Sequence, residues 1–202
     1  MRIIGSLVIA GLLAALGVWA WLSSAQGFSA RAMPTAIEAF AAKTARQLAL
    51  PAGARDTPNP IPNSPEVLEE AMAHWADHCA ICHANNGNAR ASEMGAQMYP
   101  PAPDMRAEAT QKLTDGELFY IIENGIRLTG MPGWGGSESA AKSSWKLVHF
   151  IRHLPQLSPD ELTAMEKMNP KGPEDRQREE DESSFLNGGT PANNHDHERE
   201  HQ

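Results

Sequence analysis

Cysteine and aromatic residues are scarce in this chain. It has only two cysteines among 202 residues, and they lie three positions apart, at Cys79 and Cys82. A disulfide framework is therefore excluded, since one bridge closing so short a loop would add little stability. Aromatic residues make up 6% of the chain, against 16 Gly and 15 Pro. This composition indicates a small, loop-rich domain that would benefit from the apolar surface of a prosthetic group.

Positive charge is scarce as well. The 17 Lys/Arg face 25 Asp/Glu, for a net charge of −8. Residues 63–166 hold fourteen acidic and seven basic residues, or −7. This acidic domain argues against a nucleic-acid partner, which requires basic surface, and favours a partner protein with a basic docking patch. Alternating strand patterns and internal repeats are also lacking, so we expect an all-α domain with a single site.

One long apolar run opens the chain. Ile3–Leu22 contains no charged residue, and a helix of this length spans the roughly 30 Å core of a bilayer. Trp19 and Trp21 near its end suit the membrane interface, and Arg2 before it predicts that the N-terminus lies inside. The alternative is a cleaved signal peptide ending near Ser23–Ala25, although the run exceeds the usual apolar length of such signals. Both interpretations export the rest of the chain.

Further along the chain, helix signals divide it into segments. Residues 34–50 have the spacing of an amphipathic helix, either packed on the following domain or lying on the membrane surface. Residues 51–63 are Pro-rich and predict an extended linker. Helix starts follow at Ser64-Pro65-Glu66, at the Thr114/Glu117 capping box, near Ser143 and at Ser158. We therefore predict four segments: an anchor (1–25), an amphipathic helix with linker (26–63), a helical domain (64–168) and an acidic tail that is disordered or partly helical (169–202).

The motif Cys79-Ala80-Ile81-Cys82-His83 is the strongest signal in the chain. C-x-x-C-H is the attachment site of c-type haem. On a helical turn the two thiols can bond the two vinyl groups of one porphyrin edge, and the next residue places an imidazole under the iron. The sequence thus predicts one covalent haem c, with His83 as an iron ligand.

A second iron ligand is expected, because an electron-carrying haem needs a six-coordinate iron, and Met opposite His is a common solution. Among nine Met, Met131 lies in a Gly-rich loop between two helices, where Gly130 permits unusual backbone angles and Pro132 stiffens the chain. Met94, Met98 and Met105 lie nearer the His83 side. The alternative ligands on helices are His74, His78, His149 and His153, which are more simply interpreted as exposed or haem-edge residues.

These features resemble a class I cytochrome c over about residues 64–156: CAICH early, a Pro-containing loop, Gly130-Met131-Pro132, and a last helix bearing Trp145. The stretch from Asp115 to Gly135 is similar to bacterial membrane-anchored monohaem cytochromes of this class. The resemblance implies an all-α class I cytochrome c fold around one haem whose edge is exposed for electron exchange.

The resemblance also implies supporting roles. Pro100 or Pro101 is expected to give a backbone carbonyl to the His83 ring. Phe119 and Trp145 are expected to pack where the first and last helices cross. Ala84 and Asn85 stand where many relatives have Gly, which alters the local turn. Three further residues are candidates to pair with the haem propionates: Arg106, Arg127 and Trp134.

We therefore expect a one-electron carrier rather than an enzyme, tethered to the bacterial cytoplasmic membrane with its haem domain on the periplasmic face. Its partners would be membrane or periplasmic redox proteins of a respiratory chain, with no small-molecule substrate. The alternatives are a haem-bearing subunit of a larger membrane redox complex, or a haem-based gas sensor or peroxidase. In the tail, His195, His197 and His201 could bind a metal, but a free, solvated tail is the simpler interpretation.

Overall fold

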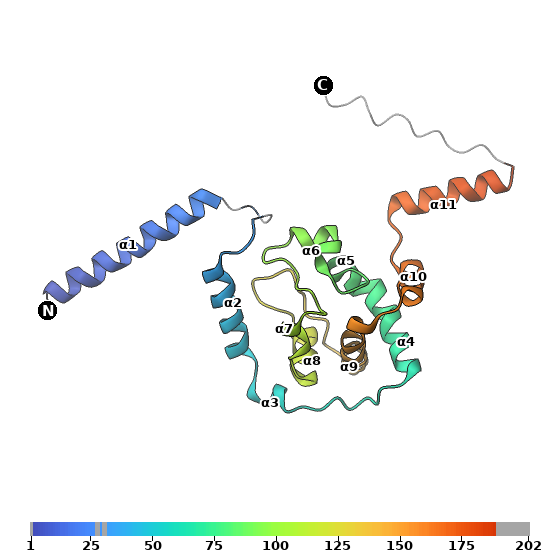
Figure 1. Ribbon diagram of the computed structural model, residues 1–202, viewed down its shortest axis with the longest axis horizontal. Coiled ribbons are helices and arrows are strands. Elements are labelled where there is room, and N and C mark those ends of the chain that lie inside the picture. The colour runs from blue at the N-terminus through green and yellow to red at the C-terminus, as the bar shows by residue number, and fades with distance from the viewer. Residues whose placement is uncertain (1, 27–28, 30–31, 189–202) are drawn as a thin grey trace, which may run out of the picture.

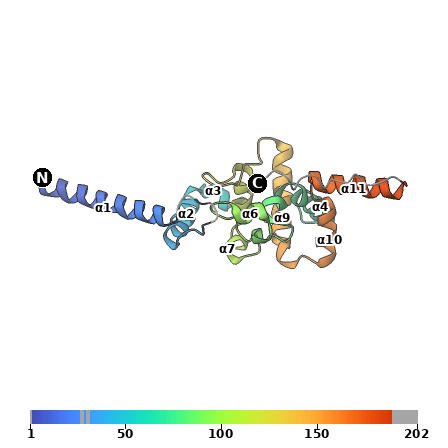
Figure 2. The ribbon, with the colours of Figure 1, turned by 90° about the horizontal axis from the view of Figure 1, so that it is seen from above.

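The computed structural model describes residues 2–26, 29 and 32–188, without the side chains of residues 2–4, 22–26 and 174. Every regular element in this part of the chain is a helix, which confirms the all-α prediction; Asn88 and Asp104 form an isolated bridge. The elements are α1 (Arg2–Gln26), α2 (Ala36–Ala49), α3 (Ala52–Arg55), α4 (Pro65–His74), η1 (Trp75–Cys79), α5 (Ala80–His83), η2 (Ala89–Ala91), α6 (Glu93–Gln97), α7 (Glu108–Gln111), α8 (Asp115–Asn124), α9 (Glu138–His153), η3 (Leu154–Gln156), α10 (Pro159–Met168) and α11 (Pro173–Leu186). Helices α3 to α10 form the body of the molecule, from which α1 and α11 project in different directions (Figures 1 and 2).

Side-chain caps fix where the main helices begin. Ser64 accepts from the backbone of Val67 at the start of α4, and Thr114 and Ser158 form capping boxes for α8 and α10. These starts agree with the sequence prediction. Helix α9 begins earlier than the predicted Ser143, because Ser137 accepts from Ala140 and caps it.

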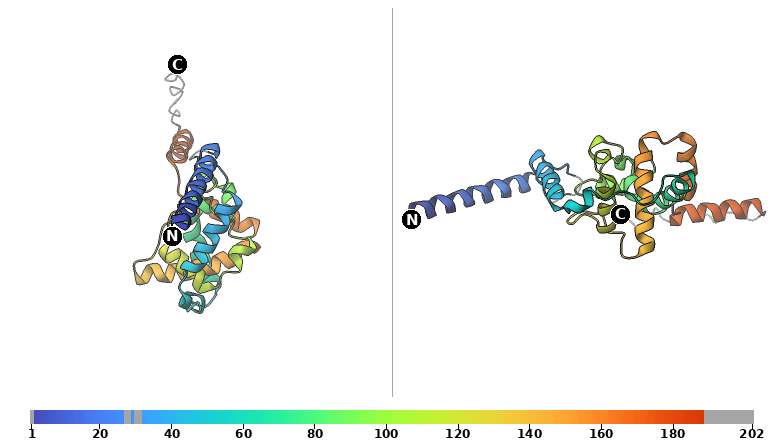
Figure 3. Two further views of the ribbon diagram at one scale, coloured as in Figure 1. Left: turned by 90° about the vertical axis from the view of Figure 1, so that its left-hand side faces the viewer. Right: turned by 90° about the horizontal axis from the view of Figure 1, so that it is seen from below.

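The core lies where α4 and η1 cross α9 (Figure 3). Trp75 on η1 packs against Phe150 on α9 with ring centroids 5.5 Å apart, and both residues are buried. Phe119 and Trp145 stack on each other at 3.9 Å, at the contact between α8 and α9. Their packing role is as expected, but the helices that they join are α8 and α9 rather than the first and last helices of the domain.

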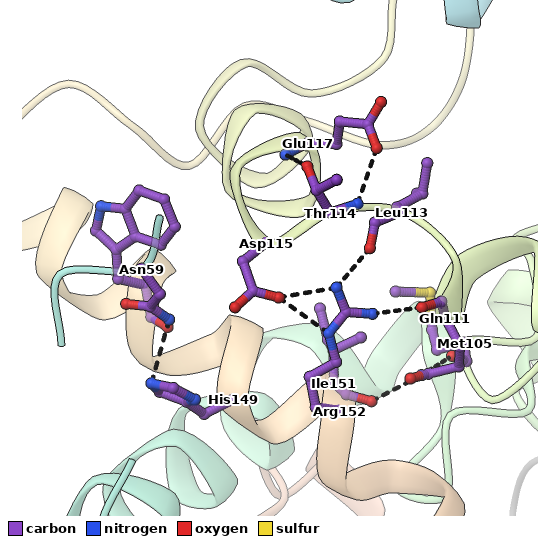
Figure 4. Close-up of polar contacts among 11 residues, drawn as sticks. Asn59, Met105, Gln111, Leu113, Thr114, Asp115, Glu117, His149, Ile151 and Arg152 are labelled. Atoms are coloured by element: carbon purple, nitrogen blue, oxygen red, sulfur yellow. Dashed lines mark hydrogen bonds and ion pairs between the residues drawn. The ribbon is translucent and has the colours of Figure 1, made fainter. Parts of the chain in front are cut away.

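Arg152 on α9 holds the segment between α7 and α8 (Figure 4). Its Nε donates to Asp115 at 3.0 Å and its Nη1 to the carbonyl of Gln111 at 2.7 Å. Gln111 in turn donates to the carbonyls of Met105 and Ile151, at 2.8 and 2.9 Å. One guanidinium and one amide thus fix a loop-rich part of the domain to its longest core helix.

The Pro-rich segment 51–63, which the sequence predicts to be extended, is not extended throughout. It contains the short helix α3, and Arg55 donates to Glu117 at 3.0 Å. Asn59 donates to the carbonyl of Trp145 at 3.0 Å, and His149 lies 2.7 Å from the carbonyl of Ile61. The composition indicated extension, whereas these contacts with α8 and α9 bind the segment to the domain.

Helix α2 has the predicted amphipathic stripe, but that stripe faces solvent. Ile37, Phe40 and Leu48 are 77%, 72% and 82% exposed. Glu38, at the start of the helix, forms a hydrogen bond with Tyr99 that lowers its pKa after the larger effect of Thr35. Of the two alternatives from the sequence, packing of the apolar stripe on the haem domain is therefore not what the structure shows.

Helix α1 is a single helix of 25 residues. Among the residues that the structure describes with their side chains, no helix has the length and apolar character needed to cross a bilayer. The membrane-spanning helix predicted for residues 1–25 is thus not confirmed and stays a prediction.

The C-terminal segment contains a helix, which is one of the two alternatives, disorder or partial helix, that the sequence leaves open. Helix α11 occupies Pro173–Leu186, with Pro at its start and Asp175 accepting from the backbone of Gly172. Lys171 pairs with Glu179, and Arg178 with Asp175. Charged residues of good helical propensity in such pairs explain a helix without an apolar face. The histidines of the predicted tail cluster, His195, His197 and His201, lie outside the described residues.

Candidate functional site: a haem c centre

The C-x-x-C-H motif sits on a helical turn braced from several sides. Cys79 ends the π-type turn η1, and Cys82 and His83 lie on α5. The indole nitrogen of Trp75 donates to the carbonyl of Ala84 at 3.1 Å, just after the motif, while Ser92 bonds the carbonyl of Ile81. Because Trp75 belongs to the core, the motif is tied to the crossing of α4 and α9.

The two cysteines are free thiols rather than a disulfide. Burial raises the pKa of Cys79 to about 12, with a smaller contribution from Cys82, and burial also raises the pKa of Cys82. Reactive C-x-x-C pairs of redox enzymes have lowered thiol pKa values. The raised pKa values differ from that pattern, and both free thiols are available to form thioethers.

His83 is 9% exposed, and its Nδ1 is buried with no hydrogen-bond partner among the described residues. Burial lowers the pKa of His83. The backbone of Pro103 raises it by a smaller amount. The ring is thus kept neutral, which is the form that binds a metal. Two free thiols beside a buried, neutral imidazole fit a covalently attached haem.

The backbone group that acts on the pKa of His83 is that of Pro103, in the same loop as Pro100 and Pro101; a carbonyl contact from Pro100 or Pro101 stays a prediction. The loop is held in place by Met105, whose N–H donates to the carbonyl of Gly87 at 2.8 Å, and by the bridge between Asn88 and Asp104. These contacts bring the end of the Pro-containing loop to the histidine. The position of this loop against α5 depends on these contacts between residues distant in sequence.

The loop bearing Met131 closes on itself. The N–H of Ile126 donates to the carbonyl of Met131 at 3.1 Å, and the N–H of Met131 donates to Thr129 Oγ1 at 3.1 Å. Trp134 N–H then returns to the carbonyl of Ile122 on α8 at 2.9 Å. Six residues are thereby fixed between α8 and α9, which suits a ligand that must keep one position in both oxidation states.

Gly130 allows a neighbouring side chain to approach the backbone closely. It does not adopt a positive φ angle. Between α8 and α9, the positive φ values belong to Gly125 (66°), Leu128 (62°) and Gly136 (121°). A Cβ on Gly130 would lie 2.8 Å from Sδ of Met98. A side chain at position 130 would force the Met98 thioether to move from this position.

Met98 is the residue whose position the sequence did not reveal. It was expected near the His83 side of the haem, yet its thioether lies against the residue before Met131. It also lines a shallow groove of about 600 Å³ beside the haem-attachment motif, together with Ile81, Glu93, Met94 and Gln97. The groove adjoins Ile81, between the two cysteines, so it belongs to the same site.

The three residues proposed for the propionates have different surroundings. Arg106 forms two hydrogen bonds to Asp104, which raise its pKa and occupy part of its fork. Arg127 is exposed. The ring of Trp134 meets that of His78 edge-on at 5.6 Å. These contacts involve protein groups alone and do not test whether any of the three residues binds a haem propionate. That role stays a prediction.

The histidines considered as alternative iron ligands have other contacts. Nε2 of His149 lies 2.7 Å from the carbonyl oxygen of Ile61, and Nε2 of His153 lies 2.6 Å from Oε1 of Glu161. His74 and His78 stack on each other at 4.8 Å, and burial, followed by repulsion from His78, lowers the pKa of His74. Each of the four thus has other contacts, and their exclusion as iron ligands stays a prediction.

The comparison with known families agrees with this site. Residues 66–151 match the family described as cytochrome C oxidase, cbb3-type, subunit III. No curated protein matches the chain. The match covers less than half of the chain and shows that this part is a c-type cytochrome domain. Such a domain is an electron-transfer domain with a covalently bound haem c and its iron.

Proposed function

We propose that this chain is a one-electron carrier in which Cys79 and Cys82 form the haem thioethers and His83 and Met131 are the axial ligands. The observation that carries the proposal is the buried imidazole of His83 on the same braced turn as two free thiols. The haem, when bound, supplies a reversible one-electron couple at its iron. The protein's part is to hold both ligands still and to exclude competing ligands.

The closed loop around Met131 supports electron transfer over gas sensing or peroxidase chemistry. A sensor or peroxidase needs a sixth position that opens easily. Here backbone hydrogen bonds at Ile126, Met131 and Trp134 hold the loop on both sides of the proposed ligand. Little rearrangement then accompanies a change of oxidation state.

The membrane tether is part of the proposal. It is supported by the uncharged run Ile3–Leu22 and by the exposed apolar stripe of α2. In this arrangement the N-terminus lies inside, and the haem domain works on the periplasmic face of the cytoplasmic membrane. A tether raises the effective concentration of the haem toward membrane-bound redox partners.

Haem attachment is tested by the double substitution Cys79→Ser with Cys82→Ser. After denaturing electrophoresis, haem staining should remain with the wild type and be lost from the double variant. Retention of haem by the variant would contradict thioether formation at these positions.

A subunit of a larger membrane redox complex is the second candidate. The description of the matched family, subunit III of a cbb3-type oxidase, favours it. The two candidates share the same haem chemistry and differ in partners. Isolation in mild detergent distinguishes them: a stoichiometric complex with other redox subunits indicates the second, and a single-chain cytochrome the first.

A further inference from the structure

His74 and His78 form an accessible pair of imidazoles outside the iron site. They lie four residues apart where α4 continues into η1, so their side chains share one face. Their ring centroids are 4.8 Å apart and their planes differ by 22°. His78 is exposed and His74 half-buried. Two histidines with this spacing on a helix can both reach one metal ion.

Asp77 orients one member of this pair. Its Oδ2 lies 3.0 Å from Nδ1 of His78, and neither side chain is buried, at 55% and 43% exposed. A carboxylate at Nδ1 holds the ring proton there, which leaves the lone pair of Nε2 for a metal. This carboxylate–imidazole pair is the arrangement that supports metal-binding histidines.

We propose that His74 and His78 bind one divalent transition-metal ion of the class that prefers imidazole, such as Zn²⁺, Cu²⁺ or Ni²⁺. Imidazole ligands select these ions over Mg²⁺ and Ca²⁺. The described residues contain no group of three or more His, Cys, Asp or Glu that could hold a metal. Water therefore completes the coordination, and the ion exchanges freely.

The position of the pair links it to the haem site. His78 directly precedes Cys79, and its ring meets Trp134, three residues after Met131, edge-on at 5.6 Å. A dication bound there adds positive charge beside both segments that hold the haem, and positive charge stabilises the reduced iron. Metal binding would thus raise the reduction potential of the haem.

The test uses the full-length protein with its haem attached and oxidised, and with His195, His197 and His201 replaced by Gln so that the tail cannot contribute. Zn²⁺ binding is measured by calorimetry, and Cu²⁺ binding by electron paramagnetic resonance. We expect one equivalent of Cu²⁺ with nitrogen coupling. Either His78→Gln or His74→Gln should weaken binding at least tenfold, and Asp77→Asn should weaken it about tenfold or more. Zn²⁺ should raise the haem potential in the parent but not in His78→Gln.

His153→Gln is the matched control, because His153 contacts Glu161 and lies outside the pair; it should bind as the parent does. The haem spectrum and circular dichroism establish that each variant is folded. If His74→Gln does not fold, the comparison rests on His78→Gln, because His78 is exposed. Equal affinity in His78→Gln and the parent, or no binding by the parent, would overturn the proposal. The outcome does not depend on whether Met131 ligates the iron.

Discussion

Among single residues, Ala84 carries a clear backbone strain. It follows His83 with φ 56° and ψ 162°, a region that glycine occupies readily and other residues rarely. Its carbonyl accepts from the core residue Trp75 at 3.1 Å, which holds the chain in this conformation. Ala84 is the residue at which the chain leaves the haem-attachment turn. Its strained conformation therefore sets the direction of the loop that follows.

Ala84→Gly should therefore stabilise the protein. Relief of the strain, less the added entropy of the unfolded chain, should raise the free energy of unfolding by about 1 kcal/mol. Denaturant unfolding of the haem-loaded protein measures it. Ala91→Gly provides a comparison at a position without positive φ and should not stabilise. A loss of stability in Ala84→Gly would show that the alanine makes packing contacts worth more than its strain.

At the scale of elements, several helices and their caps were predictable, whereas the start of α9 and the partners of the helices were not. The capping boxes at Thr114 and Ser158 are local patterns, and local patterns fixed the starts of α8 and α10. The carbonyl beside His83, the approach of Met98 to Gly130 and the binding of segment 51–63 to α9 all depend on residues distant in sequence. The motif residues could be named from the sequence because their spacing carries the chemistry, whereas their supporting contacts arise from tertiary packing.

The pairing of α3 with α8 through Glu117 makes a pH-dependent contribution to stability. Burial raises the pKa of Glu117, but the Thr114 backbone and the Arg55 guanidinium outweigh it, so the pKa lies below its ordinary value. A lowered pKa in the folded state means that the contribution is complete above the unfolded pKa and is lost as the pH falls through the folded pKa.

Glu117→Gln should thus lower the free energy of unfolding at neutral pH by about 1–3 kcal/mol, since its side chain is only 6% exposed. The difference from wild type should shrink as the pH falls below the ordinary carboxyl range, as followed by denaturant titrations at several pH values. Glu108→Gln, which breaks the exposed pair with Lys112, is the control and should change stability by less than about 0.5 kcal/mol. A Glu117→Gln effect that is constant across pH would contradict the assignment.

At the scale of the whole molecule, the haem domain lies between two projecting helices, α1 and α11 (Figures 1 and 2). The apolar side chains of α1 and the stripe of α2 are exposed. The proposed tether gives both surfaces a role, with α1 as the anchor and α2 beside it.

Deletion of residues 2–26 behind a cleavable export signal should release the haem-loaded protein from the membrane. The expected result is haem-stained protein in the soluble periplasmic fraction, with the wild type in the membrane fraction. Continued membrane association of the deleted chain, abolished by a further Phe40→Glu, would assign the anchor to α2 instead of α1.

The central claim is that Met131 occupies the sixth coordination position of the haem iron. Carbon monoxide binding to the reduced protein tests this claim most directly. At neutral pH the haem spectrum of the wild type should not change, nor should that of Met98→Ala, whereas Met131→Ala should bind carbon monoxide promptly and keep its haem. Prompt, stoichiometric binding by the wild type would contradict the account and indicate a sensor or an enzyme.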